Sequence, residues 1–327
     1  MSRTLVLLCL ALSLPSGCED KDDDKNQSTS GSGSSSGAWL VGDDGQMWRI
    51  AGDGAVTPYP AQADVDLRAI ACVGRSEAWV VGDRGTLLST SDGGEHWQQH
   101  ALAIDRDLVA VAVGEPVGGA AKVVVAGDGV LLGSVGDGSF VHLDDGDHDW
   151  TGVAVDAGGA RVLAVADDGS VWRMDEGEPL RLVARFEAQP LAAVALSPAG
   201  DAAVVVGAAG FVARSRDGGT HWQAEAVPTV RDLWAARIDK RGVAVVAVGD
   251  AGAVVRIDEN GATAQEQLDP ALALRALHLH AGGGGHAVGD AGTVLVTHDA
   301  GSSWDAVALP SSVGFAGVDD IQLGPHW

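Results

Sequence analysis

Short runs of alternating apolar and polar residues, separated by glycine-rich turns, follow one another from about residue 38 onward. One representative stretch carries such runs at 66–74, 77–83, 86–90 and 96–103, with turn residues between them. Alternation with a period of two is typical of a β-strand. No segment shows a convincing helical period. The pattern therefore predicts an all-β chain whose repeating unit is a group of four strands.

The same glycine turn recurs about every 40 residues. Its copies are VGDDG at 41, VGDRG at 81, AGDG at 126, VADDG at 165, VGAAG at 206, and VGDAG at both 248 and 288. Repeats of this length are typical of β-propellers, in which each repeat forms a blade of four strands. An open sheet of so many strands would expose its edges, which radial packing of blades avoids. We therefore expect a seven-bladed β-propeller of four-stranded antiparallel blades.

The two ends of the repeat region complement each other. The first recognisable strand, AWLVGD at 38–43, matches the second strand of a blade. The last apolar stretch, FAGVDDIQL at 315–323, matches the first strand that this blade lacks. We expect the N-terminal and C-terminal strands to share one blade and close the ring.

The first 37 residues have a different composition. Arg3 precedes a short apolar run that ends in LPSGC at 14–18, and this pattern resembles the signal peptide of bacterial lipoproteins. The resemblance implies cleavage after residue 17 and lipidation of Cys18, although Pro15 stands where leucine is usual. An ordinary cleaved secretory signal is the alternative. Residues 18–37, acidic and then rich in Gly and Ser, are typical of a flexible tether. We expect an extracytoplasmic lipoprotein, periplasmic or at the cell surface, with the propeller at 38–327.

Charge and cysteine content narrow the function classes. The chain has 45 acidic residues against 21 Lys and Arg, a formal net charge of −24, which disfavours nucleic-acid binding. Without Cys9 and Cys18, Cys72 is the one cysteine left, so the propeller has no intramolecular disulfide. A lone cysteine in the apolar run LRAIACVG is expected to be a small core residue.

Three repeats carry a sharper pattern, S/T-x-D-x-G-x-x-W, which is the Asp-box or BNR-like motif. We expect the aspartate to accept backbone N–H bonds across a tight hairpin, the glycine to take a positive φ, and the tryptophan to cover the turn. These roles are structural. The residues are Thr90, Asp92, Gly94 and Trp97, then Ser215, Asp217, Gly219 and Trp222, then Thr297, Asp299, Gly301 and Trp304.

The whole stretch AWVVGDRGTLLSTSDGGEHW at 78–97, with copies at 204–222 and 286–304, resembles the seven-bladed propellers of the photosystem II stability and assembly factor family. Related Asp-box propellers include sialidases and some glucanases. The resemblance covers about 38–325. It implies a non-enzymatic scaffold that assists assembly of a membrane protein complex. Because no feature of the chain indicates a photosynthetic host, only the fold and the binding role are carried over.

Few residues of the sequence indicate an enzyme active site or a metal site. A sialidase needs a tyrosine nucleophile, and the single tyrosine, Tyr59, lies between two prolines. A glucanase of this type uses two propellers, and one propeller supplies half a cleft. We predict no catalytic residue, cofactor or metal site. The acidic loop HLDDGDHDW at 142–150, with Asp144 and Asp149, has calcium-type ligands or is a solvated loop. His278 and His280 lie two apart on one strand, where packing is favoured over a zinc site.

The predicted strand order places the glycine turns and the loops between blades on one face, and the Asp-box hairpins on the other. A partial ring of carboxylates would then face one way. We hypothesise that it binds a basic protein segment or a cation. Alternatively, each aspartate stabilises its own turn. The ring comprises Asp43, Asp83, Asp128, Asp167, Asp250 and Asp290, with Ala208 in the seventh place.

Two tryptophans near that face, Trp150 and Trp234, would be partner anchors or wedges between blades. The sequence is also compatible with two other functions. One is a carbohydrate-binding or glycan-cleaving propeller, and the other is a structural protein of the cell surface.

Overall fold

The structure, a computed structural model, describes residues 37–51, 55–60, 62–74, 76–114, 121–136, 138–144, 146–265, 273–280, 282–309 and 314–321. The predicted signal peptide at 1–17, Cys18 and nearly all of the tether at 18–37 lie outside these residues. Gly37, the last tether residue, begins the first strand. Among the described residues no helix has the length and apolar character needed to cross a membrane.

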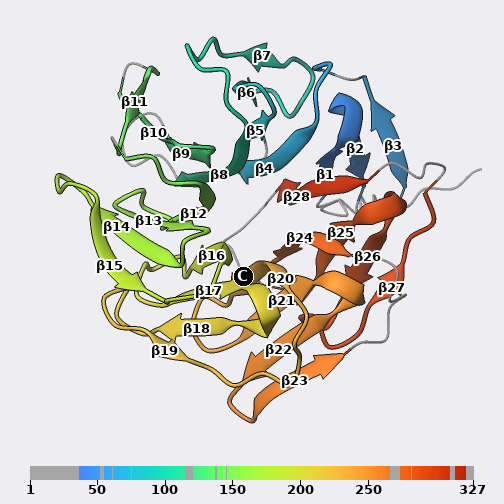
Figure 1. Ribbon diagram of the computed structural model, residues 1–327. Helices are drawn as coiled ribbons and strands as arrows, with labels where there is room; N and C mark the ends of the chain where they lie inside the picture. The colour runs from blue at the N-terminus through green and yellow to red at the C-terminus, as the bar shows by residue number, and fades with distance from the viewer. Residues whose placement is uncertain are drawn as a thin grey trace, which may run out of the picture. The chain divides into compact units, whose positions relative to one another are not determined.

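The strands form seven separate antiparallel sheets of four strands, which are the blades of a propeller (Figure 1). Blade 1 contains β28 (Phe315–Ile321), β1 (Gly37–Gly42), β2 (Met47–Ile50) and β3 (Val56–Tyr59). Blade 2 contains β4 (Leu67–Val73), β5 (Glu77–Gly82), β6 (Thr86–Thr90) and β7 (Gln98–Gln99). Blade 3 contains β8 (Leu108–Gly114), β9 (Lys122–Gly127), β10 (Val130–Ser134) and β11 (Phe140–His142). Blade 4 contains β12 (Trp150–Val155), β13 (Arg161–Ala166), β14 (Ser170–Asp175) and β15 (Arg181–Arg185).

The remaining blades follow the same order from the first strand to the fourth. Blade 5 contains β16 (Leu191–Leu196), β17 (Ala203–Gly207), β18 (Val212–Ser215) and β19 (Gln223–Ala224). Blade 6 contains β20 (Leu233–Ile238), β21 (Val245–Gly249), β22 (Val254–Asp258) and β23 (Gly261–Gln265). Blade 7 contains β24 (Leu274–Leu279), β25 (Gly285–Gly289), β26 (Val294–Thr297) and β27 (Asp305–Ala306).

The ring closes through blade 1. Strand β28 pairs antiparallel with β1, with Leu40 opposite Val318 and Trp39 opposite Asp319. The first strand of every blade contacts the first strand of the next, and β28 contacts both β24 and β4. These contacts confirm the predicted seven-bladed ring and the shared blade.

The predicted fourth strand at 96–103 is wrong in its length. Strand β7 contains only Gln98 and Gln99, followed by one further backbone bond from His100 to Leu87. Beyond that point Leu102 and Ile104 pack against the core between blades 2 and 3. Burial of these two side chains draws the chain away from the edge of its own sheet.

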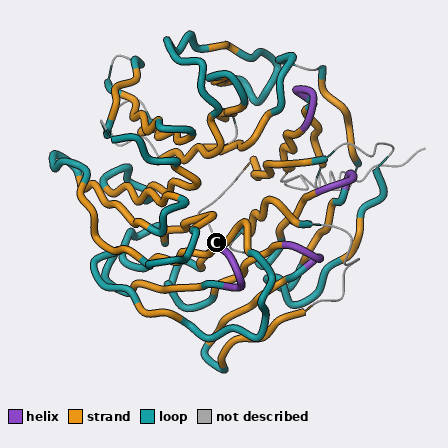
Figure 2. The backbone as a smooth tube through the Cα atoms, in the orientation of Figure 1, coloured by secondary structure: helices purple, strands orange, loops and turns teal. Residues whose placement is uncertain are grey.

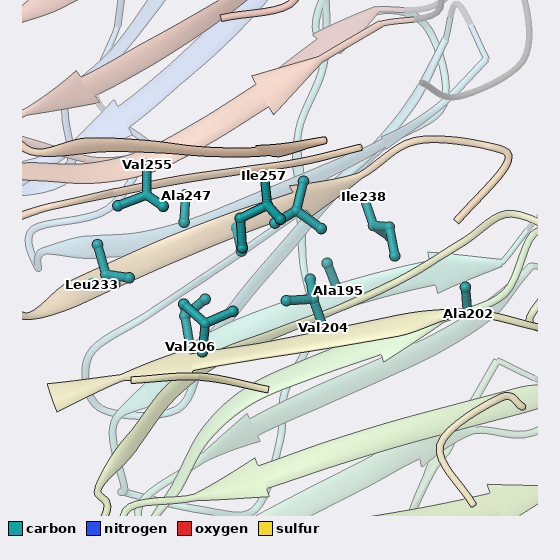
Figure 3. Close-up of a cluster of buried hydrophobic side chains, with 12 residues drawn as sticks. Ala195, Ala202, Val204, Val206, Leu233, Ile238, Ala247, Val255 and Ile257 are labelled. Carbon is teal, nitrogen blue, oxygen red and sulfur yellow. The ribbon is translucent and has the colours of Figure 1, made fainter. Parts of the chain in front are cut away.

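The core lies between neighbouring blades. Figure 3 shows the cluster between blades 5 and 6, where Val204 and Val206 of β17 face Leu233 and Ile238 of β20. Small and β-branched side chains dominate each such layer, because two pleated sheets in face-to-face contact leave little space between them. Trp150, 2% exposed, occupies the layer between blades 3 and 4.

The glycine turns of blades 1, 2, 5, 6 and 7 are tight two-residue hairpins with two successive residues of positive φ. In the first of them, Asp44 and Gly45 have φ of 56° and 69°, and Gln46 N–H donates to the Asp43 carbonyl oxygen. Two successive residues with positive φ define a type I′ turn, whose twist suits neighbouring strands. Figure 2 draws four of these turns as short helices, at Asp43–Gly45, Ala208–Gly210, Asp250–Gly252 and Asp290–Gly292.

Candidate functional site

One face of the ring, which we call the turn face, carries the glycine turns and the loops that lead from one blade into the next. In blade 2, Asp83 N–H donates to the Asp66 carbonyl oxygen at 3.0 Å, and in blade 3, Asp128 N–H donates to Asp107 at 3.1 Å. The same bond recurs in every blade. The other donor and acceptor pairs are Asp43 and Gly314, Asp167 and Asp149, Ala208 and Pro190, Asp250 and Asp232, and Asp290 and Ala273.

Close backbone approach explains the glycine before each turn aspartate. A Cβ at Gly82 would lie 2.3 Å from the Asp66 carbonyl oxygen, and a Cβ at Gly127 would lie 1.9 Å from that of Asp107. Real Cβ atoms do not come so near to an oxygen, so a side chain here would push the turn away. Ala166 in blade 4 is the single exception among the seven repeats.

Aspartates in the inter-blade loops join successive blades, a role that the sequence pattern alone did not predict. The Asp107 carboxylate accepts the Arg84 backbone N–H at 2.9 Å, which links blade 3 to the turn of blade 2. In the same way, the Asp66 carboxylate accepts the Asp44 backbone N–H at 2.9 Å, and the Asp232 carboxylate accepts the Ala209 backbone N–H at 2.7 Å. The sequence signal is an aspartate directly before the first apolar residue of a first strand, in phase with the repeat.

Each first strand also contains a β-bulge at its second residue, where the ladder register skips one position. A bulge inserts one extra residue into a strand, so its side chain points in another direction than the regular alternation of the two sheet faces would give. In blades 2, 6 and 7 the bulge residue contacts the turn aspartate of its own blade. The seven bulge residues are Ala316, Arg68, Val109, Thr151, Ala192, Trp234 and Arg275, in the order of blades 1 to 7.

Where the bulge residue is an arginine, it pairs with the turn aspartate of the same blade. Arg68 holds Asp83 through two bonds, from Nε at 2.7 Å and from Nη2 at 2.9 Å. Arg275 holds Asp290 in the same way, at 3.1 and 3.2 Å. Such two-bond pairs fix the geometry of both groups. These two carboxylates are half-buried and carry little uncompensated charge.

Blade 6 uses an aromatic residue for the same purpose. Trp234 Nε1 donates to the Asp250 carboxylate at 2.7 Å, and the Arg275 guanidinium lies over the Trp234 ring at 5.2 Å from its centre. Trp234 is therefore part of a paired cluster, whereas Trp150 lies in the core. The structure thus favours a wedge between blades for Trp150 over a partner anchor.

The other three turn aspartates, Asp43, Asp128 and Asp167, are exposed. Their bulge residues are Ala316, Val109 and Thr151, none of which carries a cation. Among the described residues, no lysine, arginine or histidine forms an ion pair with these three carboxylates or with the exposed Asp149. Three carboxylates of the predicted ring, in blades 2, 6 and 7, are therefore hydrogen-bonded by a bulge residue, and the three in blades 1, 3 and 4 are not paired with a cation.

Like charges lie close together in blades 3 and 4. Partial burial, then Asp149 and Asp168, raise the pKa of Asp167 above its ordinary value. Asp128 and Asp149 face each other across an isolated antiparallel bridge. We call Asp128, Asp149 and Asp167 of blades 3 and 4 the acidic arc. Partial burial and Asp66 raise the pKa of Asp43 in the same way.

The opposite face, which we call the hairpin face, carries the S/T-x-D-x-G-x-x-W turns. Asp92 Oδ1 accepts from Thr90 Oγ1 at 2.8 Å and from His96 N–H at 3.0 Å, and Gly94 N–H donates to Thr90 Oγ1 at 3.0 Å. The same bonds recur around Asp217 and Asp299. Each of the three carboxylates is occupied by its own turn.

The glycine of each hairpin lies against the preceding blade. A Cβ at Gly94 would lie 2.3 Å from the Trp39 ring, and Trp97 packs edge-on against Trp39 at 5.8 Å. The corresponding neighbours of Gly219 and Gly301 are Leu163 and Val246. The hairpins therefore contribute to packing between blades as well as to their own turns.

The loop considered for calcium is only partly described, because Asp145 lies outside the described residues. Asp147 is exposed and lies 3.8 Å from the Arg106 guanidinium. In the described part of this loop no three carboxylate or imidazole groups converge on one point. Cys72 is buried and not in a disulfide.

A groove between blades 2 and 3 contains three aromatic side chains. Trp79 stacks on His100 at 4.9 Å, and Phe140 meets Trp79 edge-on at 6.1 Å. These rings separate two hollows of about 280 and 390 Å³. Glu77 and Ser134 add polar groups to the smaller one.

No protein-family model matches this chain, and no curated protein matches it in sequence. Solved structures do match. YCF48 bound to a D1 peptide aligns with TM-score 0.59 and 17% identity, covering 78% of this chain and 90% of that chain. YCF48 from Cyanidioschyzon merolae aligns with TM-score 0.59 and 16% identity, covering 78% and 89%. A streptogramin B lyase aligns with TM-score 0.64 and 12% identity, covering 75% and 84%.

The chain is a seven-bladed β-propeller. At these identities the likeness concerns the fold alone. The same fold carries a peptide-bound protein and a lyase among these structures, so function has to be argued from the surface and its chemistry.

Proposed function

We propose that this propeller is a non-enzymatic scaffold that binds a basic segment of a protein partner over the acidic arc of the turn face. The observation that carries the proposal is the division of the turn aspartates. Asp83 and Asp290 are paired with Arg68 and Arg275, and Asp250 accepts a hydrogen bond from Trp234. The carboxylates of the acidic arc are exposed and form no ion pair among the described residues, although Arg106 donates to the Asp128 carbonyl oxygen.

The negative charge of the acidic arc favours partners that carry positive charge. Crowded carboxylates repel each other, and a lysine or arginine placed among them relieves that repulsion. A surface of one charge sign also attracts an oppositely charged segment at long range, which raises the association rate and disfavours acidic partners. The formal charge of −24 strengthens both effects.

Two further observations support a binding role. A similar structure is a propeller bound to a peptide, and another is the WD40 propeller domain of Doa1. On the hairpin face, the carboxylates of Asp92, Asp217 and Asp299 are already engaged by N–H and hydroxyl groups of their own turns. Assistance in assembling a membrane or envelope complex is the role we propose for this binding.

Fluorescence anisotropy with a labelled lysine-rich peptide tests the proposal. Replacing Asp128, Asp149 and Asp167 by Asn is expected to weaken binding at least tenfold at low salt. A matched variant, in which the exposed hairpin-face residues Glu95, Glu176 and Glu259 become Gln, changes the net charge equally and is expected to retain affinity. Equal losses in both variants, or no binding by the unaltered protein, would contradict the proposal.

We also propose that the protein is anchored outside the cytoplasm through a lipid on Cys18, with residues 19–36 as the tether. The support is the sequence LPSGC after an apolar run. Cys18→Ser is expected to move the protein from the detergent phase to the aqueous phase in a Triton X-114 partition. Cys9→Ser, within the cleaved segment, is the control and leaves partition unchanged. Retention of Cys18→Ser in the detergent phase would contradict the anchor.

A glycan is the second candidate ligand, favoured by the aromatic groove between blades 2 and 3. Aromatic rings beside hydroxyl and carboxylate groups suit the apolar faces and polar edges of sugars. Phe140→Ala is expected to abolish retardation of the protein in gels containing laminarin or xylan, while Phe186→Ala between blades 4 and 5 leaves it unchanged. Migration of the unaltered protein without retardation would remove this candidate.

A further inference from the structure

The fifth residue of every first strand faces one central cavity. Counted from the residue that follows each inter-blade loop, these positions repeat once per blade and all line the same space of about 170 Å³. Ala157 and Pro198, in turns between first and second strands, also line it, which places the cavity toward the hairpin face. The seven residues, in the order of blades 2 to 7 and then 1, are Ala71, Ala112, Ala154, Ala195, Arg237, His278 and Asp319.

The two halves of this residue ring differ in character. Blades 2 to 5 contribute alanine, the smallest side chain with a Cβ, so that side of the cavity stays wide. Blades 6, 7 and 1, which are consecutive around the ring, contribute Arg237, His278 and Asp319. His278 and Asp319 are only 3% and 8% exposed. Buried polar and charged groups are costly unless they are hydrogen-bonded, paired or serve a ligand.

Asp319 organises the polar half. One of its carboxylate oxygens contacts His278 Nδ1, and the other accepts the Cys72 backbone N–H at 2.6 Å. Burial alone would raise the pKa of Asp319, but the charge and hydrogen bond of His278, then Arg237 and the Cys72 N–H, hold it below its ordinary value. The carboxylate is therefore ionised. Its contact with Nδ1 also fixes the orientation of the His278 ring.

Arg237 is the permanent cation of the cavity. Its Nη1 donates to the Ala236 carbonyl oxygen at 3.1 Å, and its side chain is half-buried beside His278 and Asp319. A guanidinium has five N–H donors in a planar fork, which suits the two oxygens of a carboxylate. Both Asp319 oxygens already face protein donors, so an additional metal cation would meet a poor ligand set here.

We propose that this cavity is a binding site for a small carboxylate anion, with Arg237 as its cation, His278 beside it and the four alanines providing its space. The volume of about 170 Å³ is far above the roughly 10–15 Å³ that one water needs. The site is separate from the acidic arc, because the fifth strand residues and the turns of the hairpin face line it. It therefore stands or falls independently of the proposed partner surface.

Isothermal titration calorimetry with malonate tests the site. Arg237→Leu removes the cation and is expected to raise the dissociation constant for malonate at least tenfold. Ala112→Leu fills the apolar side without touching the polar half, and it is expected to have the same effect by excluding the anion. Arg216→Leu, an exposed arginine of the hairpin face, is the matched control and leaves the constant unchanged.

Two results of the calorimetry would contradict the proposed site. Absence of saturable malonate binding by the full chain would overturn the proposal. So would binding that survives Ala112→Leu, because the anion would then occupy another part of the surface. Circular dichroism establishes that each variant is folded. Should Arg237→Leu fail to fold, Arg237→Lys keeps the charge but not the planar fork, and the proposal expects weaker malonate binding from it.

Discussion

The Asp107 carboxylate lies 2.9 Å from the Arg84 backbone nitrogen and accepts its N–H, so that the loop leading into blade 3 holds the turn of blade 2. Equivalent bonds join blade 1 to blade 2 and blade 5 to blade 6. Among the described residues, no other inter-blade aspartate makes this contact. The stability of the ring therefore depends unevenly on its inter-blade loops.

Asp107→Ala is expected to destabilise the protein by roughly 1 kcal/mol, the usual net value of one such hydrogen bond. Asp107→Asn keeps an acceptor oxygen and is expected to cost less. The measurement is the free energy of unfolding in urea. Asp105→Ala, an exposed neighbour in the same loop, serves as the control. If Asp105→Ala costs as much as Asp107→Ala, the bond to Arg84 contributes nothing specific.

Close approach in the turns predicts a second stability effect. A methyl group at Gly249 would lie 2.0 Å from the Asp232 carbonyl oxygen, so Gly249→Ala must displace the turn of blade 6. We expect a loss of about 1–3 kcal/mol, the usual range for an overpacked site. Gly158→Ala is the matched control, since it has nothing within 4 Å and no positive φ. Thermal or urea unfolding of the two variants compares them, and equal stability would contradict the argument.

The hairpin aspartates predict how stability depends on acid. Hydrogen bonds from Ser303 and Thr297 lower the pKa of Asp299 to about 2, and similar bonds from His96 and His221 lower those of Asp92 and Asp217 further. A carboxyl group with a lowered folded pKa contributes stability that is complete above its unfolded pKa of about 4. That contribution is lost as the pH falls through the folded pKa.

The urea midpoint is therefore expected to fall steeply between pH 4 and pH 2. A variant in which Asp92, Asp217 and Asp299 are all replaced by Asn is expected to be less stable at pH 7 and to show a shallower decline over that interval. Glu95→Gln, in the first hairpin, is expected to keep the original pH dependence. A triple variant that declines as steeply as the unaltered protein would show that these bonds do not govern acid unfolding.

Pairing on the turn face predicts a gain of affinity. Arg68→Ala removes a cation and exposes Asp83, so a lysine-rich peptide is expected to bind severalfold more tightly at low salt. The effect should shrink at high salt, where screening shortens the range of charge interactions. Arg216→Ala on the hairpin face is the control. Anisotropy titrations at two salt concentrations measure the change, and unchanged or weaker binding by Arg68→Ala would contradict it.

The architecture could be predicted because the repeat is carried by short local signals. The turn glycines mark each blade, and the match between AWLVGD and FAGVDDIQL predicted the closing pair of β1 and β28, which the register of Leu40 and Val318 confirms. The fourth strand was predicted too long, because burial of Leu102 and Ile104 in the neighbouring layer is a tertiary effect.

The surface chemistry could be predicted only in part. Alignment of the turns identified the six aspartates, but which of them are paired depends on the bulge residues, and a bulge leaves no clear signal in one sequence. Arg68 and Asp83 meet because a bulge turns the arginine toward the turn. The cluster of Arg237, His278 and Asp319 was missed because its members lie on three different blades and meet only when the ring closes.

The most direct test of the central claim is zero-length carbodiimide crosslinking of the lysine-rich peptide to the protein, with the joined carboxylates identified by mass spectrometry. This reagent joins an amine only to a carboxylate that it contacts. The proposed binding mode predicts crosslinks to Asp128, Asp149 and Asp167 of the acidic arc. Crosslinks mainly to Glu95, Glu176 and Glu259 of the hairpin face would contradict it.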